Sequence, residues 1–315
     1  MNEPARVYRN RRATALVGLA GVLLLAFLAI RSCGGEASPT TATPAATEAA
    51  AQPTAELPRG GRRIFPNFRV VAFYGAPQDE QLGALGIGTP AAAGRRLERV
   101  ARAYAKKSRP VLPAFELIST IATAAPGGDG LYRTHQSDEV IGRYLRAARA
   151  AKALLLLDIQ PGRADFLTEV RRLERWLREP DVGIALDPEW HVGPEEVPGQ
   201  VLGAVTAEEI NAVSEYVARI VVDHNLPEKL FVVHQFTDGM IEGKERVVKR
   251  SGLAVTMNVD GFGDRPNKIS KYTQFTSEPV RFHDGFKLFY EEDTNLMSPG
   301  AVLELRPPPD LVVYE

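Results

Sequence analysis

The sequence predicts an α/β fold, a closed (β/α)₈ TIM barrel, and two observations carry this prediction. From residue 68 onward, short apolar segments alternate with amphipathic segments of helical periodicity, which is typical of parallel strands joined by helices. The segment Val182–Val192 (VGIALDPEWHV) begins as a buried strand and then turns polar at Asp187, Glu189 and His191. Such a strand is typical of a (β/α)₈ barrel, whose active site lies at the carboxyl ends of the strands.

Eight apolar segments are predicted to form the strands. They cover residues 68–74, 111–118, 153–160, 182–192, 230–236, 253–260, 286–291 and 310–314. On the fourth strand, Asp187 and Glu189 share one face with Gly183 and Ala185, and the alternate residues are all apolar. An all-apolar face is expected where helices cover a parallel strand, so the polar face is predicted to point into the barrel.

Helices are predicted between most of these strands, at residues 90–107, 137–151, 164–178, 206–225 and 298–305. Thr206 and Glu209 have the spacing of a capping box, which supports a helix start at this point. Eight strands favour a closed barrel over an open doubly wound sheet. The first strand is followed by no Gly-x-Gly-x-x-Gly turn, so the sequence lacks the usual marker of a dinucleotide-binding fold.

Composition excludes several classes of protein. The formal net charge of −1 argues against a nucleic-acid partner, because such proteins carry a basic surface. The single cysteine, Cys33, cannot form a disulfide within the chain. The five histidines have no local zinc-ligand spacing, and we expect neither a metal nor a cofactor.

The first 33 residues are predicted to be a basic cytoplasmic stub followed by a membrane anchor. An uncharged run from Ala13 to Ile30 is just long enough to span a bilayer, and arginines precede it. The residues around Cys33 (IRSCG) resemble a bacterial lipobox, although Arg31 departs from that pattern. A lipidated Cys33 and a free thiol beside an uncleaved anchor both remain open. Either anchor places the barrel outside the cytoplasmic membrane.

Residues 34–64 are predicted to be a disordered linker, and residues 65–315 the barrel domain. The linker is rich in Ala, Thr and Pro and has almost no large apolar side chain. Such a segment buries too little apolar surface to offset the entropy lost on ordering.

Polar residues gather where the predicted strands end. A buried carboxylate is costly without a partner, so acidic residues at several strand ends indicate a binding or catalytic site. Asp187 and Glu189 are the catalytic candidates. The candidates for substrate binding are Glu116, Asp158, Gln160, Trp190, His191, His234, Gln235, Asn258, Asp260 and Glu291.

Two carboxyl groups two residues apart on one strand face can shift each other's pKa. A glycosidase needs such a pair, because one group must be a protonated acid while an anion stabilises positive charge at the sugar ring. Asp187 and Glu189 therefore favour an enzyme that acts on a glycosidic bond.

The residues from Gly183 to Glu189 also resemble the strand-four signature of glycoside hydrolase family 18, the chitinase-like barrels. That signature is Asp-Gly-x-Asp-x-Asp-x-Glu, and here Val182 and Ala185 replace its two earlier acidic residues. Met257-Asn-Val-Asp260 is similar to the family's Met-x-Tyr-Asp, with Val259 in place of tyrosine. The resemblance implies that Glu189 is the general acid, that Asp187 assists it, and that the partner is a polysaccharide or cell-wall glycan.

Two alternatives remain open. The first is a barrel at the cell surface that binds a glycan or a partner protein without turnover, because barrels can keep their fold while losing their chemistry. The second is a metal-dependent hydrolase that uses Asp187, Glu189, His191 and His234 as ligands. Against the second, three alternate residues span roughly 13 Å on an extended strand, too far for one ion unless the strand bends.

Overall fold

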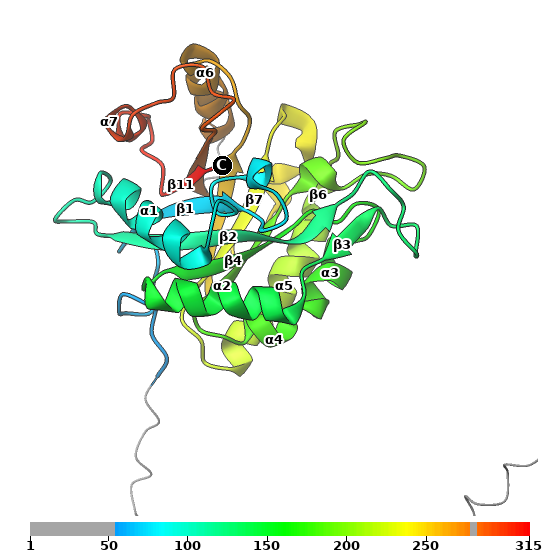
Figure 1. The fold of residues 1–315 in the computed structure, drawn as a ribbon, viewed down its shortest axis with the longest axis horizontal. Coiled ribbons are helices and arrows are strands. Elements are labelled where there is room, and N and C mark those ends of the chain that lie inside the picture. The colour runs from blue at the N-terminus through cyan, green and yellow to red at the C-terminus, as the bar shows by residue number, and fades with distance from the viewer. Residues whose placement is uncertain (1–53, 278–281) are drawn as a thin grey trace, which may run out of the picture. The chain divides into compact units, whose positions relative to one another are not determined.

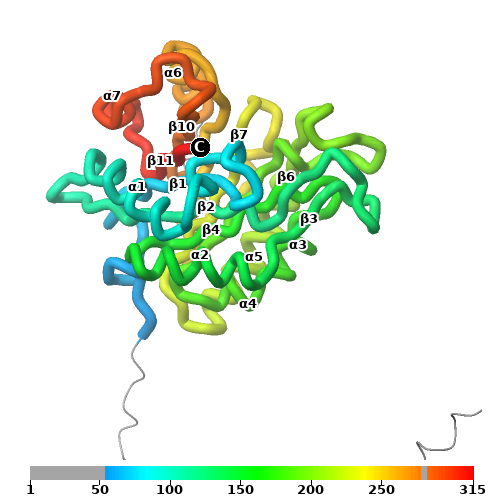
Figure 2. The backbone as a smooth tube through the Cα atoms, in the orientation of Figure 1, coloured from blue at the N-terminus to red at the C-terminus, as the bar shows by residue number. Residues whose placement is uncertain are grey.

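A computed structural model of the chain describes residues 54–277 and 282–315. Its central feature is a sheet of eight parallel strands that closes on itself, since β1 pairs with both β2 and β11 (Figures 1 and 2). In order around the barrel the strands are β1 (Arg69–Gly75), β2 (Val111–Ala122), β4 (Leu154–Ile159), β5 (Val182–Leu186), β7 (Lys229–Gln235), β9 (Leu253–Val259), β10 (His283–Leu288) and β11 (Leu311–Tyr314). The predicted closed barrel of eight parallel strands is confirmed.

Helices cover the outer face of the barrel. They are α1 (Pro90–Arg102), α2 (Asp138–Ala150), α3 (Phe166–Arg172), α4 (Glu174–Leu177), α5 (Ala207–Asp223), α6 (Arg265–Thr276) and α7 (Pro299–Leu303). Helices α2 to α5 lie together on one side, and α6 and α7 lie on the opposite side (Figure 1). The predicted helix at 164–178 is divided into α3 and α4, and α6 was not predicted from the sequence.

Short elements lie in the connections between the strands. They are β3 (Arg133–His135), β6 (Val205–Thr206), β8 (Ile241–Glu242) and the 3₁₀ helices η1 (Glu80–Leu82), η2 (Pro188–Trp190), η3 (Asp238–Met240) and η4 (Lys244–Arg246). Strand β2 continues beyond the barrel, and its end pairs with β3 in antiparallel fashion. Strands β6 and β8 form a separate parallel pair.

The strands have two differently packed faces, as the alternation on β5 predicts. On the outer face, Ile184 and Leu186 belong to the large apolar core between the sheet and the helices. On the inner face, Ala185 belongs to a second cluster that fills the barrel. The inward residues of this second cluster include Val70, Ala72, Leu112, Ala114, Leu154, Leu156, Leu230, Val232, Ala254, Leu311 and Val313.

The folded part begins before the predicted boundary at residue 65. Leu57 and Ile64 are buried in the inner cluster, and Arg59 forms an ion pair with Glu98 on α1. The last residues assigned to the linker therefore pack on the barrel. The predicted anchor and Cys33 lie outside the described residues, and within those residues no helix has the length and apolar character needed to cross a membrane.

Local sequence signals explain how individual elements start and pack. The predicted capping box is present, since Thr206 accepts from the Glu209 amide while the Glu209 carboxylate accepts from the Thr206 amide. Gly183 is required by close packing within the sheet, because a Cβ at this position would lie 2.5 Å from the Leu230 carbonyl oxygen. Because glycine has no side chain, β5 and β7 can approach each other at this position.

Replacing Gly183 with alanine should destabilise the barrel. We expect the Gly183→Ala variant to lose about 1–3 kcal/mol in free energy of unfolding, because the added methyl group forces β5 away from β7. The measurement is a urea titration followed by circular dichroism. Gly128→Ala is the matched control, since a Cβ there meets no atom within 4 Å. Equal stability of both variants would contradict this account of the β5–β7 contact.

Candidate functional site

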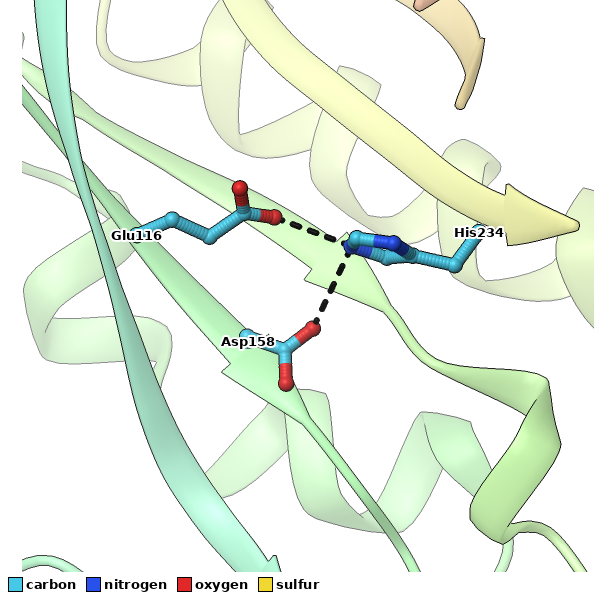
Figure 3. A group of neighbouring side chains, drawn as sticks. All are labelled: Glu116, Asp158 and His234. Carbon is cyan, nitrogen blue, oxygen red and sulfur yellow. Dashed lines mark hydrogen bonds and ion pairs between the residues drawn. The ribbon is translucent and has the colours of Figure 1, made fainter. Parts of the chain in front are cut away.

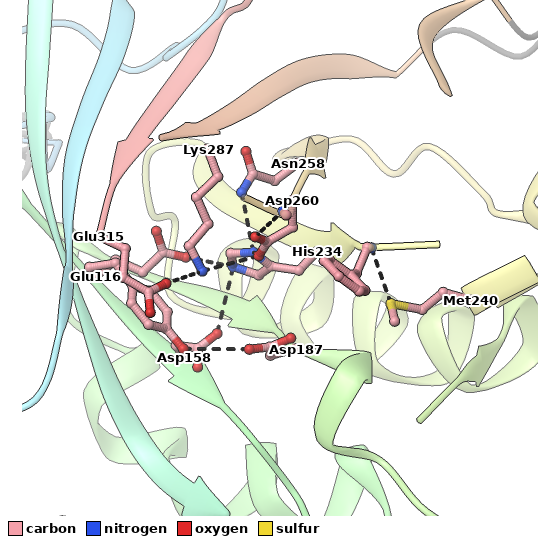
Figure 4. Close-up of polar contacts among 12 residues, drawn as sticks. Glu116, Asp158, Asp187, His234, Met240, Asn258, Asp260, Lys287 and Glu315 are labelled. Carbon is pink, nitrogen blue, oxygen red and sulfur yellow. Dashed lines mark hydrogen bonds and ion pairs between the residues drawn. The ribbon is translucent and has the colours of Figure 1, made fainter. Parts of the chain in front are cut away.

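The inner face of the barrel changes from apolar to polar toward the carboxyl ends of the strands. Six of the eight strands contribute a polar side chain to this layer, and the residues directly after β5, β9 and β11 add three more; Figure 4 shows most of them pointing toward one another. They are Tyr74 on β1, Glu116 on β2, Asp158 on β4, His234 on β7, Asn258 on β9, and Lys287 on β10, with Asp187, Asp260 and Glu315 directly after β5, β9 and β11.

A chain of charged contacts crosses the barrel. The Lys287 Nζ lies 3.0 Å from Asp260 Oδ2, and the same oxygen lies 2.8 Å from His234 Nδ1. On its other side, His234 Nε2 lies 3.0 Å from Glu116 Oε1 (Figure 3). These side chains alone thereby connect four strands or strand ends.

Lys287 is the cation that several groups share. Besides Asp260, it contacts Glu315 Oε2 at 2.6 Å and lies 3.9 Å from the centre of the Tyr74 ring. Its pKa is held well above the usual value: burial opposes this shift, but the carboxylates of Asp260 and Glu315 outweigh burial. Burial alone would also raise the pKa of Asp260, yet Lys287 and His234 hold it well below its usual range.

Other carboxyl groups in this layer have fewer hydrogen-bond partners. Asp158 is fully buried, and neither of its oxygens has a hydrogen-bond partner. One oxygen of Glu116 and one of Asp187 also have none. Burial, followed by the neighbouring charge of Asp187, raises the pKa of Asp158 well above its usual value. The barrel interior therefore holds more carboxyl groups than cations to pair with them.

A cavity of about 210 Å³ opens at this end of the barrel. It brings together five predicted site residues, Gln160, Asp187, Glu189, Trp190 and Asp260, and its wall also includes Lys287 and Tyr74. Three aromatic side chains, Trp190, Phe236 and Phe262, form part of the wall. Polar groups beside aromatic surface are typical of a small-molecule site.

Glu189 reaches the cavity by a different route from the one predicted. Strand β5 ends at Leu186, and Pro188–Trp190 forms the 3₁₀ helix η2, so Glu189 and Trp190 lie on a turn rather than on a strand. Both side chains are partly exposed and line the cavity. Burial, followed by the charges of Asp187 and Asp260, raises the pKa of Glu189 to about 7.

Tyr74 and Gln160 form a second polar contact beside Asp187. Gln160 donates from Nε2 to the Tyr74 hydroxyl at 2.9 Å, and this hydroxyl lies 3.4 Å from Asp187 Oδ2. Gln160 also accepts from the backbone amide of Ala122, at the end of β2. Burial is the main cause that raises the pKa of Asp187, while His234 and Lys287 oppose the rise.

Three predicted binding residues lie elsewhere. Gln235 points outward, because its inward neighbour on β7 is His234, and its side chain accepts from Lys244. His191 packs against Phe166 and contacts the Ala204 carbonyl oxygen instead of the cavity. Glu291 is exposed, because β10 ends at Leu288 and not at residue 291. The structure therefore does not bring these three residues to the cavity.

Glu116, Asp158, His234 and Asn258 are at the predicted strand ends but do not line the cavity. All four are buried within the barrel. Asn258 Nδ2 lies 3.2 Å from His234 Nδ1, so the amide belongs to the same cluster. They are therefore interior neighbours of the cavity, not part of its surface.

The metal-ligand set considered from the sequence does not form, because His191 lies outside the cavity. Among the described residues, a different group has side-chain atoms close enough for one ion, namely Glu116, Asp158 and His234. Their candidate ligand atoms lie within 4.8 Å of one another.

Sequence reasoning missed Lys287, Tyr74 and Glu315. Lys287 stands between two large apolar residues, Phe286 and Leu288, and both of these are buried. A lysine flanked in this way within a predicted parallel strand was the available signal, because a lysine is almost never fully buried without a partner.

Comparisons with known proteins support no family assignment. No protein-family model matches the chain, and no curated protein sequence matches it. The resemblance to glycoside hydrolase family 18 therefore stays a prediction.

Solved structures of similar shape have low sequence identity. A spore coat polysaccharide biosynthesis protein from Bacillus subtilis matches with a TM-score of 0.42 and 12% identity, over 78% of this chain and 59% of that chain. A sugar phosphate isomerase/epimerase from Parabacteroides distasonis matches with a TM-score of 0.38 and 10% identity, over 78% and 86%. A D-allulose 3-epimerase from Methylomonas sp. matches with a TM-score of 0.36 and 10% identity, over 79% and 84%. Because all three TM-scores are below 0.5, the assignment of the barrel fold rests on the strand pairing of this chain.

Removing the Lys287 charge should destabilise the protein strongly. We expect Lys287→Met to cost about 3–5 kcal/mol in free energy of unfolding, because it leaves the buried Asp260 carboxylate without its ammonium partner. Chemical denaturation measures this loss. Lys107→Met, at an exposed lysine, should stay within about 0.5 kcal/mol of the unmodified protein. A stable Lys287→Met variant would show that the ion pair contributes little.

Proposed function

We propose that this barrel hydrolyses a glycosidic bond in a polysaccharide or cell-wall glycan, with Glu189 as general acid and Asp187 assisting. The observation that carries the proposal is the Glu189 carboxyl group in the cavity, with its pKa raised to about 7. At neutral pH such a group is protonated in a large fraction of molecules, and it can also release its proton. Those two properties are what a general acid needs.

The neighbouring groups suit this role. The Glu189 proton would pass to the oxygen of the leaving sugar as the glycosidic bond breaks, and a water molecule would then bond to the sugar carbon and release the proton that restores Glu189. The carboxyl group of Asp187, oriented by the Tyr74 hydroxyl, would lie beside the sugar carbon at which positive charge develops. Trp190 and Phe262 offer aromatic surface for the apolar face of a sugar ring, and Gln160 offers an amide for its hydroxyl groups.

The proposed location follows from the N-terminal sequence alone. We propose that residues 1–33 anchor the chain in the cytoplasmic membrane, as a single span or through a lipid on Cys33, with the barrel outside. An extracytoplasmic barrel on a linker would have access to cell-wall glycans, which agrees with the proposed substrate.

The Glu189→Gln variant tests the role of the acid. It keeps the shape of the side chain and removes the proton, so hydrolysis should fall by about 10²–10⁴-fold while glycan binding stays near normal. The assay measures reducing ends released from a panel of cell-wall and storage polysaccharides, with retention of the same glycans as the binding measurement. Glu291→Gln is the control, because Glu291 is exposed and outside the cavity. Full activity of Glu189→Gln would place the acid elsewhere. Binding without hydrolysis by the unmodified protein would favour the non-catalytic barrel.

The pH profile gives an independent test. The acid must be protonated to act, so kcat/KM should fall about tenfold per pH unit above a midpoint near 7. Asp187, Asp260 and Glu315 raise this midpoint, and Lys287 lowers it. The Asp187→Asn variant should therefore shift the descending limb to lower pH. A profile that stays flat from pH 6 to 9 would exclude Glu189 as the acid.

A further inference from the structure

We propose that Glu116, Asp158 and His234 bind one divalent transition-metal ion, of the Zn²⁺ or Mn²⁺ type, inside the barrel (Figure 3). Three strands, β2, β4 and β7, contribute one side chain each, and all three side chains are almost completely buried. The proposal rests on this cluster and does not depend on glycosidase activity.

The orientation of His234 favours a metal ligand. Its Nδ1 lies 2.8 Å from Asp260 Oδ2, and Asp260 also pairs with Lys287, so this oxygen is an acceptor and Nδ1 carries the hydrogen. The other ring nitrogen, Nε2, then faces the carboxyl groups of Glu116 and Asp158. A histidine fixed by a carboxylate on one nitrogen and directed at an ion by the other is the usual arrangement in metal sites.

The distances suit a small ion. His234 Nε2 lies 3.0 Å from Glu116 Oε1 and 3.8 Å from Asp158 Oδ2. In a tetrahedral site with bonds of roughly 2.0–2.2 Å, neighbouring ligand atoms lie roughly 3.3–3.6 Å apart. The two separations from His234 bracket that range, and all three ligand atoms lie within 4.8 Å of one another, so side-chain adjustments would bring them to bonding distance of one ion.

Unpartnered oxygens point to a missing cation. Asp158 is fully buried and neither oxygen has a hydrogen-bond partner, and one oxygen of Glu116 has none either. Lys287 contacts Asp260 and Glu315, and within the described residues His234 is the cationic group in contact with Glu116 and Asp158. A buried carboxylate without a partner is costly, and a divalent ion would compensate both groups at once.

The ligand types narrow the choice of ion. One imidazole and two carboxylates suit Zn²⁺ or Mn²⁺, whereas Ca²⁺ takes six to eight oxygen ligands and Mg²⁺ prefers an octahedral shell with several waters. Asp260 lines the cavity and contacts His234, so the proposed ion site lies next to the cavity. On binding, the ion would replace any proton held by His234 Nε2 or by the Asp158 carboxyl group.

The test is metal binding by the full chain after removal of metals with EDTA. We expect Zn²⁺ or Mn²⁺ to bind at about one ion per chain, measured by elemental analysis and calorimetry, and to raise the melting temperature. Asp158→Asn should weaken the affinity about 100-fold or more, and Asp260→Asn, which alters the support of His234, about 10–100-fold. Asp223→Asn is the control, because Asp223 is exposed on α5, and it should bind as the unmodified chain does.

Two results would overturn the proposal. One is unchanged ion affinity in both Asp158→Asn and Glu116→Gln. If Asp158→Asn does not fold, unchanged affinity in Glu116→Gln alone overturns the proposal. The other is that the unmodified chain binds no ion and is less stable in EDTA than the Asp158→Asn variant. That result would show that Asp158 is a buried neutral acid. Neither readout uses glycan hydrolysis, so failure of the Glu189 hypothesis would leave this test intact.

Discussion

The ion pair between Lys287 and Asp260 is the interaction on which the polar end of the barrel depends. A closed barrel excludes water from its interior, so a carboxylate there needs a cation from the protein itself. Lys287 supplies that cation from β10, and Asp260 passes its effect to His234 on β7 by accepting from the imidazole. The position of His234 then decides what Glu116 and Asp158 can contact. Four groups from separate strands are thus held in one geometry by a single ammonium group.

The carboxyl groups differ in burial and in access to solvent, and these differences suit them to different chemical roles. Glu189 lies on a turn at the cavity and is only partly buried, whereas Asp158 lies deep in the barrel with no hydrogen-bond partner. Burial raises the pKa of both groups, but only Glu189 can meet a molecule from solvent. The barrel can therefore combine an acid that reaches a substrate with an interior cluster suited to an ion. The acid depends on a turn, and the interior cluster depends on the ends of the strands.

The closed barrel, the inward face of β5 and the cavity positions of Asp187 and Asp260 could be predicted from the sequence, because apolar runs and strand periodicity report them directly. Side-chain direction on β7 could not, because its run LFVVHQ is apolar on both faces and gives no sign of which of His234 and Gln235 points inward. The end of β10 was misplaced for a related reason, since Phe289 and Tyr290 extend its apolar run beyond Leu288. The apolar neighbours of Lys287 signal that it is buried, but they do not identify its partners, Asp260 after β9 and Glu315, because pairing between distant segments leaves no local pattern.

Strand β2 extends beyond the barrel and pairs there with β3, and this extension has a mechanical consequence for the cavity. The Ala122 amide at its tip holds the Gln160 side chain, which in turn donates to the Tyr74 hydroxyl. The hairpin and the cavity wall are thus joined by two successive hydrogen bonds. A substitution that disturbs the pairing of β2 with β3 would therefore change how Gln160 and the Tyr74 hydroxyl are held beside Asp187.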